Sequence, residues 1–279
     1  MSLPERVFIT ADELARRLDA GERITLLDVR WSLPEPDGGA AYEAGHLPGA
    51  VYVSLDDELA DHAATGRGRH PLPSGAGLQE AARRWGVRTG VPVVVYDDWN
   101  RAASARAWWV LTAAGVPDVR ILDGGLSAWT GQLDTGTVTP VPGDVTVAHD
   151  DLYVGARPTV TAEGVPGIGV LLDARAPERY RGEVEPVDPV AGHIPGARNV
   201  PSTSLLTTDG TWRPQRELTD LFDSHGVTAD SEVAAYCGSG VTAAVTVAAL
   251  AAVGIDAALY PGSWSEWSSD PARPVEITP

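Results

Sequence analysis

The sequence predicts an α/β protein built from two tandem domains, each a mainly parallel sheet flanked by helices. Three observations support this: the length of the chain, an internal repeat, and the alternation of short apolar runs with helical patterns. The 279 residues suffice for two domains of ordinary size. The hydrophobic fraction of 43% allows a packed core in each.

The internal repeat has a period of about half the chain, and five landmarks recur in the same order with similar spacing. The first copy holds LDVR (27–30), GHLPGA (45–50), VVVYD (93–97), Gly124-Gly125 and Trp129. The second holds LDAR (172–175), GHIPGA (192–197), VAAYC (233–237), Gly262-Ser263 and Trp267. A duplication of this kind predicts two similar domains. We place them at residues 1–135 and 159–279, joined by a linker at 136–158 that is rich in Gly, Thr, Pro and Asp.

Short apolar runs alternate with helical patterns in both copies. The expected strands are 24–29, 91–96 and 119–122 in the first copy, and 170–173, 232–236 and 257–260 in the second. The expected helices are 104–114 and 241–253. This alternation favours parallel sheets covered on both faces. Such sheets bind ligands beyond the carboxyl ends of their strands, which is where Cys237 falls.

Composition excludes several function classes. A net charge of −17 would repel phosphate backbones and anionic lipids, so we expect neither nucleic acid nor a membrane as partner. The single cysteine excludes an intramolecular disulfide and a cysteine-rich metal site, and the six His show no H-x-x-x-H spacing. We therefore expect no metal and no cofactor. The N-terminal residues lack a targeting pattern, and the apolar run at 241–255 is too short to span a bilayer, so the expected location is the cytoplasm.

Cys237 lies in a glycine-rich loop, Cys237-Gly238-Ser239-Gly240-Val241-Thr242, that runs from a strand end into a helix. The glycines allow the backbone N–H groups to converge into a nest, and the helix adds the positive end of its dipole. Both stabilise a thiolate. A buried structural cysteine is the common alternative, but the glycines and the strand-to-helix position favour a nucleophile.

The residues around the cysteine narrow the chemistry. A cysteine phosphatase needs an Arg six residues after the cysteine, where this chain has Ala243. A disulfide oxidoreductase needs a second thiol. Acyl transfer with His193 or His225 as the base stays open on sequence grounds. A lone thiolate in a nest suits the capture of one sulfur atom as a persulfide.

These motifs resemble the two-domain rhodanese superfamily of thiosulfate and 3-mercaptopyruvate sulfurtransferases. The resemblance runs from about Phe8 to Trp267 and depends on the paired G-H-[IL]-P-G-A segments, LDGG (122–125) and the cysteine loop. It implies two rhodanese-like domains, of which the second is catalytic. The first is expected to be inactive, because Asp97 stands at the position equivalent to the cysteine.

The resemblance also suggests site residues. The loop without basic side chains is similar to the mercaptopyruvate type, and Arg181 matches an arginine that binds the substrate carboxylate. A second family arginine is missing from residues 183–190, which leaves open whether Arg198 replaces it. Two members of a proposed Ser–His–Asp relay match Ser239 and His70. A gapless count puts Ser54 at the Asp position, with Asp56 and Asp57 close by.

We therefore expect Cys237 and Ser239 to be catalytic, and a larger group to bind substrate: Arg181, His70, Gly238, Gly240, Val241 and Thr242. The expected activity moves sulfane sulfur from 3-mercaptopyruvate or thiosulfate to cyanide, a thiol or a thioredoxin-like acceptor through a Cys237 persulfide. The alternatives are a thiosulfate-specific rhodanese and a sulfur-relay module that turns over little alone. His46 and His193 recur in both copies, only one of which has the cysteine, so we interpret them as structural.

Overall fold

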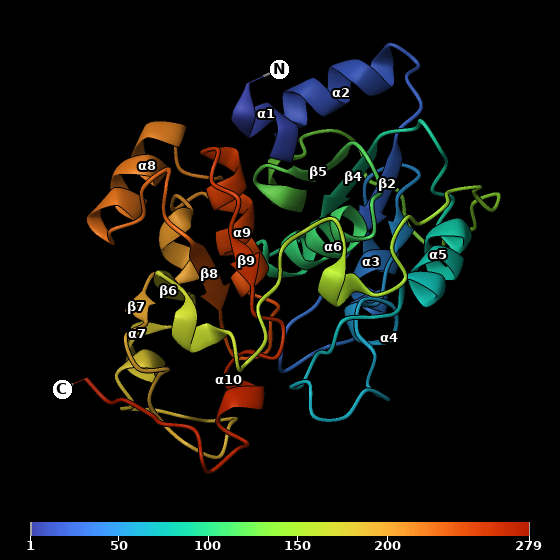
Figure 1. Ribbon diagram of the computed structural model, residues 1–279. Coiled ribbons are helices and arrows are strands. Elements are labelled where there is room, and N and C mark those ends of the chain that lie inside the picture. Colours follow the sequence, from blue (N-terminus) through green and yellow to red (C-terminus); the bar gives the residue numbers. More distant parts are fainter. Residues whose placement is uncertain (1, 279) are drawn as a thin grey trace.

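Two parallel sheets organise the chain (Figure 1). The computed structural model describes residues 2–278. The first sheet has the order β1-β5-β4-β2-β3, formed by Phe8–Ile9, Val119–Leu122, Val93–Tyr96, Thr25–Asp28 and Val51–Tyr52. The second has the order β7-β6-β8-β9, formed by Arg198–Asn199, Val170–Asp173, Val233–Tyr236 and Ala258–Leu259. Every strand pair in both sheets is parallel, so the predicted fold class is confirmed.

Helices cover the sheets of both copies. Those of the first copy are α1 (Leu3–Val7), α2 (Ala11–Asp19), α3 (Gly39–Ala44), α4 (Leu55–Glu58), α5 (Gly75–Arg84) and α6 (Ala102–Ala113). Those of the second are α7 (Pro177–Tyr180), α8 (Gln215–Ser224), α9 (Ala243–Ala252) and α10 (Ser263–Trp267). Short 3-10 turns complete the chain: η1 (Gly125–Ala128), η2 (Leu152–Val154), η3 (Val165–Gly167) and η4 (Ser202–Leu205).

The repeat seen in the sequence is also a repeat in strand register. Asp28 of β2 pairs with Tyr96 of β4, and Asp173 of β6 pairs with Tyr236 of β8. In each copy the chain then leaves the central strand at the same edge of the sheet, at Asp97 in the first and Cys237 in the second. The duplication therefore places these two side chains at equivalent corners.

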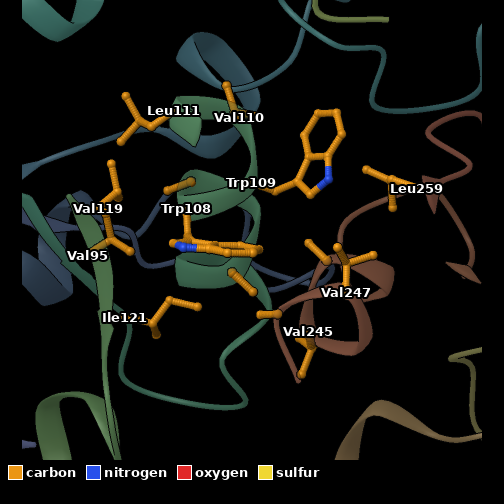
Figure 2. Close-up of a cluster of buried hydrophobic side chains, with 14 of the residues drawn as sticks. Val95, Trp108, Trp109, Val110, Leu111, Val119, Ile121, Val245, Val247 and Leu259 are labelled. Carbon is orange, nitrogen blue, oxygen red and sulfur yellow. The ribbon is translucent and has the colours of Figure 1, made fainter. Parts of the chain in front are cut away.

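The two copies share one continuous core. Helices α6 and α9 pack against each other in the centre of the molecule, and α1 also contacts α9 (Figure 1). Trp108 and Trp109 of α6 are buried. Figure 2 shows Trp108 facing Val95 and Ile121 of the first sheet, while Trp109 points toward Val247 of α9. This packing brings loops of both copies together around the cysteine.

The segment between the copies lies against the first one. Gly143 N donates to Arg83 O at 2.7 Å and Ala148 N to Ala114 O at 2.9 Å.

Within residues 2–278, no helix is long and apolar enough to cross a membrane. In the same range, no group of three or more His, Cys, Asp or Glu side chains could hold a metal ion.

Candidate active site

Cys237 directly follows β8 and is 1% exposed. The N–H of Gly240 points at its Sγ at a distance of 3.2 Å, an interaction that stabilises a thiolate. Gly240 has φ +77°, and a β-carbon there would lie 2.3 Å from Pro261 O, so only glycine fits this turn. The N–H of Cys237 donates to Ser263 Oγ at 3.1 Å, which fixes the loop to the start of α10.

The equivalent loop of the first copy shows what this corner of the fold binds. There the carboxylate of Asp97 accepts hydrogen bonds from the N–H groups of Trp99, Arg101 and Ser104 at 3.1–3.2 Å, and from Ser104 Oγ at 2.7 Å. The converging N–H groups thus hold an anion. In the second copy the group at this corner is the sulfur of Cys237.

Ser239 and His70, which are distant in sequence, meet beside the cysteine loop. His70 Nδ1 lies 2.7 Å from Ser239 Oγ, and His70 Nε2 lies 3.2 Å from Asp56 Oδ1. Trp31 Nε1 donates to the same oxygen of Asp56 at 3.1 Å. Burial, with the nearby charges of Arg106 and Arg69, lowers the pKa of His70 to about 3. His70 is therefore neutral near pH 7, donating to Asp56 and accepting from the Ser239 hydroxyl.

The third member of this chain is Asp56 and not Ser54, where the gapless count ended. Ser54 instead caps α4, its Oγ accepting from the N–H of Asp57 at 3.2 Å and donating to the Asp57 carboxylate at 2.8 Å. The position differs because this chain and the family pattern need not have the same number of residues after the GHLPGA segment. Asp56 follows in the first turn of α4, facing His70.

The structure does not place Arg181 at the loop, which corrects the sequence-based assignment. Its side chain is 37% exposed, and its Nε pairs with Glu183 at 2.7 Å. The guanidinium groups next to the loop belong to Arg179 and Arg69. A β-carbon on Gly238 would lie 3.5 Å from Arg179 Nη1 and 3.5 Å from Arg69 Nη2. Arg179 precedes Arg181 by one half-turn of α7, which turns the two side chains in different directions.

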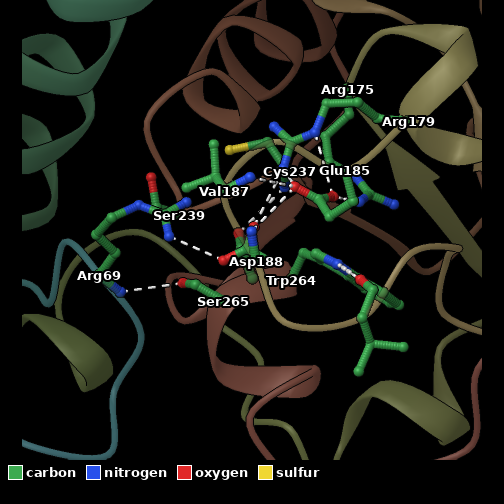
Figure 3. A network of polar contacts seen from close by, with 12 residues as sticks. Arg69, Arg175, Arg179, Glu185, Val187, Asp188, Cys237, Ser239, Trp264 and Ser265 are labelled. Carbon is green, nitrogen blue, oxygen red and sulfur yellow. Dashed lines mark hydrogen bonds and ion pairs between the residues drawn. The ribbon is translucent and has the colours of Figure 1, made fainter. Parts of the chain in front are cut away.

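The segment that lacks the family arginine carries two carboxylates toward these cations. Asp188 pairs with Arg69 at 2.8 Å and with Arg179 at 3.1 Å. Glu185 pairs with Arg179 at 2.6 Å and with the buried Arg175 at 3.5 Å. Burial is the largest single influence and raises the pKa of Glu185, but the hydrogen bonds from Arg179 and from the N–H groups of Asp188 and Val187, with the charge of Arg179, together outweigh it and lower the pKa. Figure 3 shows this network beside Cys237.

Arg198 does not replace the missing arginine. Its guanidinium donates to the carbonyl of His225 and would clash with a side chain at Gly226. Of the other predicted loop residues, Val241 is buried and Thr242 occupies the N-cap position of α9 without a side-chain capping hydrogen bond. His46 and His193 bond through Nδ1 to the carbonyls of Tyr42 and Tyr180, at 2.9 and 2.8 Å, as expected for structural residues.

Arg106 of α6 is a site residue that sequence reasoning missed. It is fully buried, and its guanidinium donates to four backbone carbonyls: Leu59, His70, Pro71 and Gly240. Burial lowers the pKa of Arg106 to about 10. One side chain therefore connects the cysteine loop to the loop that carries His70. A lone arginine within the apolar run 102–113 was the available signal, because a charge there must find buried partners.

Comparison with known proteins agrees with this geometry. The rhodanese-like domain family matches residues 10–132 and 161–270. The chain belongs to the rhodanese-like domain family. Two relatives within it are similar over nearly their whole length. A Mycobacterium tuberculosis protein named "Putative thiosulfate sulfurtransferase SseB" is 65% identical over 274 residues, covering 97% of this chain and 96% of the relative. A Pseudomonas aeruginosa protein named "Probable 3-mercaptopyruvate sulfurtransferase" is 44% identical over 277 residues, covering 96% of each.

Solved rhodanese structures show the same arrangement. The crystal structure of SseA from Escherichia coli, described among 3-mercaptopyruvate sulfotransferases, superposes with a TM-score of 0.79 at 35% identity. The match covers 92% of this chain and 98% of SseA. The predictions of two rhodanese domains and of a sulfurtransferase are thus confirmed.

Proposed function

We propose that Cys237 carries sulfane sulfur as a persulfide from 3-mercaptopyruvate to a thiophilic acceptor. The observation that carries the proposal is the position of its sulfur. The sulfur of Cys237 accepts a hydrogen bond from the N–H of Gly240. In the equivalent loop of the first copy, backbone N–H groups bind the Asp97 carboxylate. As the chain's single cysteine, Cys237 is also its only persulfide carrier.

With 3-mercaptopyruvate as donor, the Cys237 thiolate attacks the donor sulfur and forms the S–S bond. The C–S bond breaks, its electron pair leaves on carbon as the enolate of pyruvate, and a proton completes pyruvate. We infer that the Ser239 hydroxyl, which donates to His70 before the donor binds, turns its proton to the donor's keto oxygen as negative charge develops there. Cyanide, a thiol or a thioredoxin-like protein then attacks the outer sulfur and regenerates the thiolate.

Thiosulfate is the second candidate donor, and the name of the 65% identical relative favours it. Attack on its outer sulfur would break the S–S bond of thiosulfate and release sulfite, leaving the persulfide. A dianion needs nearby cations to offset its desolvation. No Lys or Arg occurs between Cys237 and Arg273, and Arg69 and Arg179 are already paired with carboxylates. We therefore propose that the mono-anionic donor is preferred.

The remaining expectations are part of the same proposal. We propose Arg179, in place of Arg181, as the cation for the donor carboxylate, with Gly238, Gly240, Val241, Thr242 and His70 forming the rest of the pocket. The domains are proposed to divide at 1–135, 136–158 and 159–279. A cytoplasmic location suits a lone thiol that must stay reduced between turnovers.

The test combines mass spectrometry with kinetics. Wild-type protein incubated with either donor, without acceptor, should gain about 32 Da, the mass of one sulfur, and Cys237→Ser should gain nothing. Steady-state kcat/KM for both donors then separates the candidates. A wild-type mass unchanged by both donors would refute the enzymatic proposal and favour a relay module charged by a partner.

A further inference from the structure

Three arginines near the cysteine loop, Arg175, Arg179 and Arg69, are each neutralised by carboxylates of this chain. Arg175 pairs with Asp173 at 2.7 Å and with Glu185 at 3.5 Å. Arg179 lies between Glu185 and Asp188, and Arg69 pairs with Asp188. Because these arginines are matched by the same number of carboxylates, the network offers an incoming anion no uncompensated positive charge.

Asp188 holds a particular place in this network (Figure 3). Its two oxygens bind different guanidinium groups, Oδ1 that of Arg69 at 2.8 Å and Oδ2 that of Arg179 at 3.1 Å. Both guanidinium groups reach the position of a β-carbon on Gly238, next to Cys237. The carboxylate of Asp188 is 3% exposed, so little solvent screens it. The groups that face Gly238 are Arg69 Nη2 and Arg179 Nη1, whereas Asp188 binds Arg69 Nη1 and Arg179 Nη2. A donor carboxylate beside Gly238 would therefore meet two cations whose charge Asp188 already offsets.

We propose that Asp188 is a specificity-determining residue, whose carboxylate occupies the anion position between Arg69 and Arg179 and selects against anionic sulfur donors in proportion to their charge. Arg69, from the first copy, is then the second cation of the donor site. This rests on the proposed function, since it concerns how a donor approaches Cys237. An anionic donor bound by these two arginines shares their charge with Asp188, and repulsion from the Asp188 carboxylate is greatest for a dianion.

The kinetic test compares Asp188→Asn with Glu183→Gln, a control in the same segment whose carboxylate pairs with Arg181 at the surface. We expect Asp188→Asn to raise kcat/KM about tenfold for 3-mercaptopyruvate and by more for thiosulfate. The change should lie in KM, because Asp188 does not contact the reacting sulfur. Arg69→Gln, made in the Asp188→Asn background, should reverse the gain. An Asp188→Asn enzyme with unchanged or lower kcat/KM would show that Asp188 only holds the arginines in place.

A chemical test does not depend on sulfur transfer. Cys237 is the only cysteine, so alkylation of the whole protein reports on it alone. The ratio of the rate with anionic iodoacetate to the rate with neutral iodoacetamide should rise at least fivefold in Asp188→Asn and stay unchanged in Glu183→Gln. An unchanged ratio in Asp188→Asn would overturn the inference even if sulfur transfer is confirmed, and a raised ratio would support it even if no donor is turned over.

The wild-type protein provides a test if substitution at Asp188 disturbs folding. Asp188→Ser, which is smaller and polar, is the second variant, and circular dichroism establishes which variants are folded. On the wild type alone, the inference requires that kcat/KM for the mono-anionic donor exceeds that for thiosulfate. A clear wild-type preference for thiosulfate contradicts it.

Discussion

Replacing Arg106 with Met should weaken both the fold and the active site. The guanidinium makes five hydrogen bonds, of 3.0–3.3 Å, to four buried carbonyls. A buried acceptor left without a donor costs about 1 kcal/mol or more, so four of them amount to about 4 kcal/mol. Removing a desolvated charge offsets part of this, as its lowered pKa indicates. We expect a net loss of about 2–4 kcal/mol in the free energy of unfolding.

The assay is urea unfolding followed by tryptophan fluorescence, with kcat measured on the same preparations. Because the Arg106 guanidinium holds the carbonyls of both His70 and Gly240, its loss should also disturb the contact between His70 and Ser239 and lower kcat about tenfold or more. The control is Arg216→Met in α8, where the side chain is 93% exposed and should change stability by about 0.5 kcal/mol or less. An Arg106→Met protein as stable and active as this control would refute the reasoning.

Three further predictions concern the site directly. Cys237→Ser should abolish sulfur transfer while leaving the circular dichroism spectrum unchanged; more than a few per cent of residual activity would exclude the persulfide. Arg179→Ala should lower kcat/KM for 3-mercaptopyruvate by the equivalent of about 2–4 kcal/mol, whereas Arg181→Ala should not; equal effects would remove Arg179 from the donor site. His70 has a folded pKa of about 3, below its unfolded value, so the unfolded state binds its proton first and stability falls as pH drops from about 6.5 toward 3. His70→Gln should flatten that part of the pH–stability curve, and urea midpoints between pH 4 and 7 that fall as steeply as in the wild type would contradict the pKa.

The sequence predicted the strands that are buried on both faces. Such strands read as continuous apolar runs, and β5 and β6 have the bounds expected for them, while β4 and β8 differ by one or two residues. Four strands have only two residues, and so short a segment carries no periodicity. Of these, β1, β3 and β7 were not predicted, while β9 was predicted as part of the longer run 257–260. The proposed domain boundaries stay a prediction.

For the candidate site, the sequence identified residues that belong to motifs but not the residues that contact them. Cys237, Ser239 and His70 could be named from motifs, because each belongs to a local sequence pattern. For His70 the sequence left Ser54, Asp56 and Asp57 open, and the fold of the first copy brings Asp56 to it. The pair of Arg69 and Asp188 could not be named, since it forms only after the two copies have packed together. Sequence separation between these pairs carries no information about distance. The misassignment to Arg181 has the same origin: a motif names the segment, while the turn of α7 decides which arginine faces the loop.

Both copies contribute residues to the candidate site, but only the second contributes the cysteine. In the first, the loop N–H groups are occupied by the chain's own Asp97, whose carboxylate is also paired with Arg101 at 3.2 Å. That corner is already satisfied and has no group that could carry sulfur. The surrounding residues of this copy nevertheless reach the other corner. Asp56, His70 and Arg106 all belong to the first copy, and all contact or support the loop of Cys237. We therefore propose that the first copy serves as a structural part of the candidate site, because its His70 contacts Ser239 and its Arg106 contacts the cysteine loop.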